Sequence, residues 1–87
     1  MTRFSLGRVI ATPGAFERID NETMWAALDR HSHGDWGELC DEDRANNENA
    51  LKVGARLMSV YSKDDEVFWV ITEADRSSTT VLLPDEY

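Results

Sequence analysis

Two histidines and an aspartate in the segment HSHGDWG are the first side chains that could support chemistry. His31, His33 and Asp35 lie close to the single cysteine, Cys40, and zinc prefers such ligands. The spacing argues against a metal site, because residues two apart point to different sides of a helix and no second ligand pair follows. The alternative is that His31 ends a helix at its negative pole while His33 lies in a loop. We therefore expect no metal and no cofactor.

A second polar cluster, EADRSSTT, precedes the C-terminal strand pattern. Asp75 and Arg76 could form a carboxylate–cation pair, and a neighbouring hydroxyl could be a nucleophile if a base lay within hydrogen-bond reach. If His31 or His33 lay beside Arg76, the histidine could act as a general acid or base and the guanidinium could hold a phosphate group. Such a pair would resemble the site of a ribonuclease. The alternative, which we favour, is turn chemistry, in which Asp75 and Ser77 bond the local backbone and Arg76 pairs with a nearby carboxylate.

Carboxylates dominate the charge of the chain. The 17 Asp and Glu residues outnumber the 9 Lys and Arg residues, and the formal net charge is -8. A chain this acidic is not expected to bind nucleic acid directly, and the same charge counts against a ribonuclease. The excess is concentrated in one predicted helix and one predicted turn, at Asp41, Glu42, Asp43, Glu48, Asp64, Asp65 and Glu66.

This acidic set has two interpretations. Carboxylates on a rigid helix and turn could imitate DNA, which carries one negative charge per ~1.7 Å of duplex axis. Such a surface would enter the basic groove of a DNA-binding enzyme with fast, salt-sensitive association. The alternative is solubility, since a net charge of magnitude about 2 to 8 is ordinary for a small soluble domain.

Trp36 lies between two glycines, Gly34 and Gly37. Flanking glycines permit unusual backbone angles or the close approach of another chain. A tryptophan in such a loop is either a plug that closes the core or an exposed anchor for a partner, and we favour the plug.

The elements that must position these residues form a single α+β domain spanning 1–87. The pattern predicts the order β-α-α-α-β-β-β, with the helices packed on one face of a mainly antiparallel four-stranded sheet. The most apolar strand is expected to lie centrally in the sheet. The expected elements are a strand at 4–11, a helix beginning at Thr12-Pro13, a helix capped by Asn21, a helix at 42–53 headed by Asp41 and ended by Gly54, and strands at 55–62, 67–73 and 78–83.

Apolar spacing predicts which side of each helix is buried. Phe16 and Ile19 give the first helix an apolar edge, and Trp25 and Leu28 share a face of the second. The third helix carries apolar residues only near its end, up to Val53. It should therefore lie mostly in solvent.

Several protein classes are excluded by composition. No apolar run approaches the roughly 20 residues of a membrane span, and no signal-peptide core follows Met1. One cysteine cannot form an internal disulfide, so a disulfide-stapled secreted domain is not indicated. We expect a cytoplasmic protein that does not contact membranes.

Four stretches of the chain are shared with a known group of proteins. These stretches are GRVIATPGA, HSHGDWG, ALKVGARLMSVY and WVITEADRSSTTVLLPDEY, of which ITEADRSSTTVLLP is the most specific. The sequence resembles a family of small bacterial proteins described as plasmid-related, which are carried on plasmids and integrated elements. The resemblance implies a cytoplasmic accessory protein of mobile DNA, and some such proteins counter host restriction or CRISPR defence. It implies no catalytic residues.

The sequence therefore favours a non-enzymatic protein that binds another protein. The sharper form is an anti-defence inhibitor that mimics DNA and binds a host nucleic-acid-binding defence enzyme. One alternative is a small ribonuclease-like toxin that uses His31 or His33 with Arg76. A second alternative is a structural homodimer joined through an unpaired strand edge or an exposed Trp36.

Overall fold

A four-stranded sheet organises the chain, and the computed structural model describes all of residues 1–87. The strand order is β1-β4-β3-β2, so β3 is an inner strand as its apolar sequence predicts. β2, β3 and β4 form the expected antiparallel meander, whereas β1 pairs parallel to β4. The elements are β1 (Arg8–Ala11), α1 (Pro13–Arg18), α2 (Asn21–Ser32), α3 (Asp41–Val53), β2 (Leu57–Lys63), β3 (Glu66–Thr72), β4 (Ser78–Leu82) and the 3-10 helix η1 (Pro84–Glu86).

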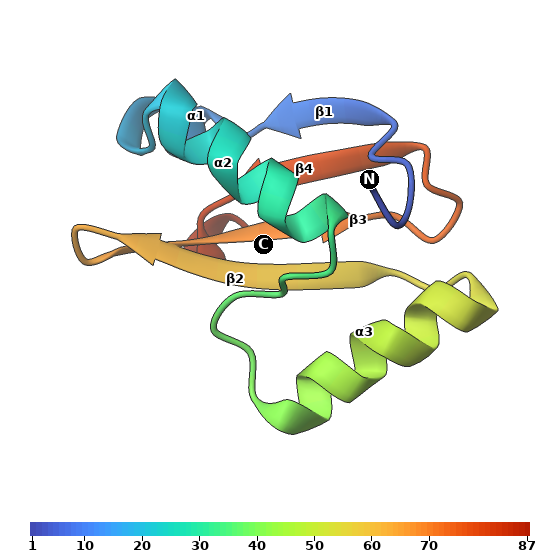
Figure 1. Cartoon of the computed structure of the whole chain (residues 1–87). Helices are drawn as coiled ribbons and strands as arrows, with labels where there is room; N and C mark the ends of the chain where they lie inside the picture. The colour runs from blue at the N-terminus through green and yellow to red at the C-terminus, as the bar shows by residue number, and fades with distance from the viewer.

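The predicted α+β class and element order are confirmed. α1 and α2 cover one face of the sheet, where Leu28 of α2 joins Phe68, Val70 and Val81 in the main core (Figure 1). Burial of such side chains is the dominant favourable contribution to folding, at about 1.5–3 kcal/mol for each large residue.

α3 departs from the predicted packing on the sheet face. It lies alongside the β2 edge, and Val53, one of the few apolar residues of this helix, is 65 % exposed. Ala50 of α3 instead joins Trp36 and Leu57 in a second, smaller core cluster. The helix is otherwise largely exposed, as its polar sequence predicts, and it ends at Gly54 with a positive φ of 71°.

The starts of β1 and α2 also differ from the prediction, while the other strand boundaries agree within two residues. The first strand begins only at Arg8, because Gly7 has a φ of +64° and turns the chain there. Asp20, not Asn21, caps α2, since its carboxylate accepts hydrogen bonds from the backbone N–H and the hydroxyl of Thr23. Thr12 caps α1 as expected.

Two large apolar side chains predicted to be interior lie on the surface. Phe16 of α1 is 69 % exposed and Trp25 of α2 is 60 % exposed. Their neighbours Ile19 and Leu28 are buried. Only part of each predicted apolar edge therefore faces the sheet.

Candidate functional site

The β2–β3 turn carries one group of the predicted acidic residues. β2 and β3 remain paired as far as Lys63 and Glu66, which leaves Asp64 and Asp65 as a two-residue loop. Both have positive φ, 52° and 67°, as in the type I′ turn that matches the twist of a hairpin. Both are exposed. The turn therefore holds two adjacent carboxylates on a well-defined hairpin.

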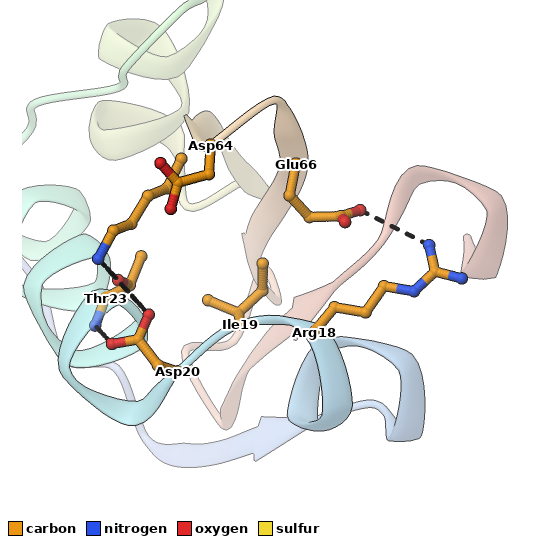
Figure 2. Close-up of a pocket in the computed structure, with 7 residues that line it drawn as sticks. Arg18, Ile19, Asp20, Thr23, Asp64 and Glu66 are labelled. Carbon is orange, nitrogen blue, oxygen red and sulfur yellow. Dashed lines mark hydrogen bonds and ion pairs between the residues drawn. The ribbon is translucent and has the colours of Figure 1, made fainter.

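A small hollow lies between this turn and the start of α2 (Figure 2). Lys63 Nζ donates to Thr23 Oγ1 at 2.9 Å and lies 3.6 Å from Asp20 Oδ1. On the other side, Arg18 Nη1 lies 3.6 Å from Glu66 Oε2. The hollow has a volume of about 150 Å³ and is lined by Arg18, Ile19, Asp20, Thr23, Lys63, Asp64 and Glu66. Each of its cations already has a carboxylate partner, so the hollow holds no free cation for an anionic ligand.

The first turn of α3 carries the second acidic group. Asp41, Glu42 and Asp43 are exposed and form no ion pair with any cationic side chain. They lie at the positive end of the helix, where the aligned peptide dipoles favour negative charge. Figure 1 shows the β2–β3 turn at one end of the sheet and the start of α3 beyond the β2 edge. The acidic residues thus form two clusters on separate elements.

Glu48, a member of the predicted acidic set, has a structural role. Its two oxygens accept hydrogen bonds from Arg3 at 3.0 Å and 2.8 Å, and Trp36 Nε1 donates to it at 2.9 Å. These bonds, first from Arg3 and then from Trp36, lower the pKa of Glu48 to about 2. With Glu66 paired to Arg18 as well, the members of the predicted acidic set that have no cationic partner are Asp41, Glu42, Asp43, Asp64 and Asp65.

Trp36 is a plug and does not serve as a surface anchor. Its side chain is only 2 % exposed and contacts Ala50 and Leu57 in the second core cluster. The following residue, Gly37, pairs with Val60 of β2, where a Cβ atom would collide with the Val60 carbonyl oxygen. Gly37 therefore allows the loop to approach the strand closely enough to bury the indole. The favoured interpretation of Trp36 as a plug is therefore confirmed, and the alternative of an exposed anchor for a partner is wrong.

His31 lies at the centre of a buried chain of hydroxyl groups. The residue is 0 % exposed, and its Nδ1 and Nε2 atoms lie 2.5 Å from Ser59 Oγ and 2.9 Å from Thr72 Oγ1. Thr72 Oγ1 lies 2.7 Å from Thr79 Oγ1, which donates to the Leu6 carbonyl at 2.7 Å. These hydrogen bonds connect α2 to the three strands of the meander and to the N-terminal segment.

The direction of these hydrogen bonds sets the tautomer of His31. Each hydroxyl has one proton to donate. Because Thr79 donates to Leu6, Thr72 must donate to Thr79 and accept from His31 Nε2–H. Ser59 then donates to His31 Nδ1. Burial, and secondarily the charge of Arg76, lowers the pKa of His31 to about 4. The imidazole is therefore neutral at pH 7.

Arg76 is also committed to structure. Its guanidinium donates to the backbone carbonyls of Ala55 and Ala50, at 2.6 Å and 3.3 Å, and so caps the C-terminal end of α3. It also donates to the carbonyls of its own turn. The favoured turn interpretation is confirmed for Asp75, which accepts from Ser77 N–H at 3.0 Å. It is wrong for the partner of Arg76, which bonds backbone carbonyls and forms no ion pair.

The predicted catalytic pair has no common cleft. Phe4 lies against both partners, with its ring 5.2 Å from the His31 ring and 5.7 Å from Arg76 Cζ. None of the four surface hollows is lined by His31, His33 or Arg76. His33 is exposed, and its Nδ1 lies 2.7 Å from the Asp29 carbonyl oxygen. The ribonuclease-like interpretation gains no geometric support.

Sequence reasoning missed the polar residues that hold the second core cluster and the histidine chain in place. Asn47 of α3 donates to the Met58 carbonyl at 2.7 Å and accepts from Met58 N–H at 3.2 Å. Ser59 and Thr72 occupy inward positions of apolar strands, and such polar residues in an apolar alternation are the signal that could have indicated a buried partner.

No group of three or more His, Cys, Asp or Glu side chains is close enough to hold a metal ion. None of the helices combines the length and the apolar composition needed to cross a bilayer. Comparison with protein-family models, with curated proteins and with solved structures found no match to this chain.

Proposed function

We propose that this protein acts by binding another protein through its two acidic clusters. The observation that carries the proposal is the distribution of ion pairs. Asp64 and Asp65 at the β2–β3 turn, and the three carboxylates at the start of α3, have no cationic partner. Glu48 and Glu66, by contrast, are each neutralised by an arginine. Free carboxylates on a helix and a tight turn suit a partner that supplies a basic surface.

The partner that fits best is a basic nucleic-acid-binding protein. A DNA duplex is recognised first by its evenly spaced negative charges, and proteins that grip DNA present Lys and Arg to them. Carboxylates held on rigid elements can pair with the same cations. Binding then loses little conformational entropy, because few flexible side chains or loops become ordered. The resemblance to proteins of mobile elements favours a host defence enzyme as that partner. The proposed function is then inhibition by imitation of DNA.

Capture from a host-cell lysate tests this proposal. The purified protein is immobilised, retained proteins are identified by mass spectrometry, and the column is eluted in parallel with salt and with duplex DNA. We expect the retained protein to be released by both, because DNA competes for the same cations. The double variant Asp64→Lys with Asp65→Lys should lose retention.

A matched control separates the clusters from net charge. Asp29→Lys with Asp85→Lys makes the same change in net charge at two exposed positions outside the clusters, and it should retain the partner. Equal retention by the wild type and the Asp64 and Asp65 double variant, unaffected by added DNA, would overturn the proposal.

A further inference from the structure

β1 is the one strand whose outer edge is open. At the other end of the sheet, Asn47 hydrogen-bonds both the N–H and the carbonyl of Met58. Val60 N–H donates to the Trp36 carbonyl, and Glu38 N–H donates to the Val60 carbonyl. The outward backbone groups of β2 are thus largely occupied, whereas β1 pairs only with β4.

The unpaired groups of β1 belong to Val9 and Ala11. Arg8 N–H donates to Ser77 and Thr12 N–H donates to Val81, so the even-numbered residues direct their backbone toward β4. Successive residues of a strand alternate in direction, which turns the N–H and carbonyl of Val9 and Ala11 away from the sheet. An open edge of this kind is a template for another strand.

An apolar groove lies beside this edge on the helical face. It has a volume of about 190 Å³ and runs between β1 and α2. Seven of the eight residues that line it are hydrophobic: Val9, Ala11, Phe16, Met24, Trp25, Leu28 and Val81. Phe16 and Trp25 are mostly exposed, so the groove and the strand edge form one continuous unpartnered surface. Exposed apolar patches of this sort usually mark a contact site.

We propose that a second copy of this chain covers this surface, with its β1 antiparallel to the first. We place the strands in the register that pairs both outward residues of each copy. Val9 pairs with the partner's Ala11, Ala11 pairs with the partner's Val9, and the two Ile10 residues face each other across the two-fold axis. The result is a continuous eight-stranded sheet. This inference rests on the sheet edge and is independent of the proposed function.

The symmetry of this pairing explains why the same chain fits. A two-fold axis perpendicular to the sheet places both α2 helices on one face, on either side of the paired β1 strands. The two grooves then merge into one apolar trough, and Phe16 and Trp25 of each copy close it from opposite sides. The surface thus supplies both the groove and the aromatic side chains that fill it, as an isologous interface requires.

Charge also favours a second copy at this edge. Two molecules of net charge -8 repel each other over most of their surface. Residues 1–16 contain no acidic side chain and carry Arg3 and Arg8. The start of α3 lies beyond β2, at the opposite edge of the sheet (Figure 1). Pairing through β1 therefore brings the least acidic parts of two copies together and leaves the acidic clusters at the periphery.

Sedimentation velocity of the full chain between ~1 μM and ~1 mM tests the proposal, a range that spans weak to moderate association. We expect a monomer–dimer equilibrium. Trp25→Glu should weaken dimerisation by about tenfold or more, because it places a charge in the trough. Ala11→Pro should also weaken it, since proline removes an outward N–H without removing a bond to β4. Val53→Glu, which alters an exposed apolar residue of α3, is the matched control and should dimerise like the wild type.

Amide exchange gives an independent readout that does not depend on any variant. The N–H groups of Val9 and Ala11 should become protected as the concentration of wild-type protein rises. A wild type that remains monomeric throughout the range would overturn the proposal. A dimer with unprotected Val9 and Ala11 amides, or one unaffected by both Trp25→Glu and Ala11→Pro in folded variants, would overturn it equally.

Discussion

His31 shows how one buried polar side chain can organise a small core. The imidazole is fully enclosed, yet both ring nitrogens have hydroxyl partners, and no buried polar side-chain atom of the molecule lacks a hydrogen bond. A satisfied polar network specifies one arrangement of its members, because any displacement leaves a donor or acceptor unpaired in a low-dielectric interior. The chain through Ser59, Thr72 and Thr79 thus fixes α2 against the sheet.

The low pKa of His31 makes stability depend on pH. An unfolded histidine has a pKa of about 6.5, whereas the buried imidazole has a pKa of about 4. Between these values the unfolded chain binds more protons, so stability is fully present above about pH 6.5 and is lost as the pH falls toward 4. From pH 7 to pH 5 the free energy of unfolding should fall by about 2 kcal/mol. Urea denaturation at the two pH values measures this loss.

Two variants isolate the contribution of His31 to this dependence of stability on pH. His31→Gln should abolish most of the change between pH 7 and pH 5, a range above the ordinary pKa of carboxyl groups. His33→Gln, at an exposed position, should retain it. If His31→Gln still lost about 2 kcal/mol of stability between pH 7 and pH 5, groups other than His31 would be responsible for the loss.

At the scale of elements, α3 is attached to the sheet by few contacts. The helix is polar along most of its length, and its Asn47 side chain takes the place of a neighbouring strand beside Met58. A carboxamide has one acceptor and one donor group, so it can satisfy a backbone N–H and a carbonyl together. This contact blocks the β2 edge and leaves the acidic first turn of the helix in solvent.

Replacing Asn47 tests the importance of this contact. Asn47→Ala should lower the free energy of unfolding by about 1–3 kcal/mol, because it removes two hydrogen bonds from a buried position. The amide of Met58 should exchange faster with solvent. Asn46→Ala, at the exposed neighbouring position, should change stability by less than about 0.5 kcal/mol. Similar losses of stability in both variants would show that helix propensity, and not edge capping, is responsible.

The elements themselves were largely predictable from sequence, but their placement was not. The meander follows from strand runs separated by short turns, and the end of α3 follows from Gly54. The position of β1 beside β4 depends on contacts far apart in the chain, for which the local pattern holds no signal. The same limit applies to Asn47 and His31, since a polar residue reveals its partner only when the fold brings that partner close. Trp25 was misplaced because periodicity cannot say how wide the buried face of a helix is.

At the scale of the whole molecule, negative charge exceeds positive charge. The chain has a net charge of -8, and its ion pairs lie at exposed or partly exposed positions, where each contributes about 1 kcal/mol or less. Self-repulsion among the remaining carboxylates destabilises the compact state. The free carboxylates of the two clusters, Asp41, Glu42, Asp43, Asp64 and Asp65, add to this repulsion.

Salt should therefore stabilise the fold. Raising the ionic strength from ~0.01 M to ~0.15 M shortens the screening length from about 30 Å to about 8 Å, which removes repulsion between distant carboxylates more than it weakens close ion pairs. We expect the Tm measured by circular dichroism to rise over this range. Asp64→Asn with Asp65→Asn should raise the Tm at low salt and reduce the further gain at high salt, because both residues are uncompensated. A Tm that falls with salt would mean that attraction within the ion pairs outweighs repulsion, and would remove the energetic basis for treating the two clusters as unopposed charge.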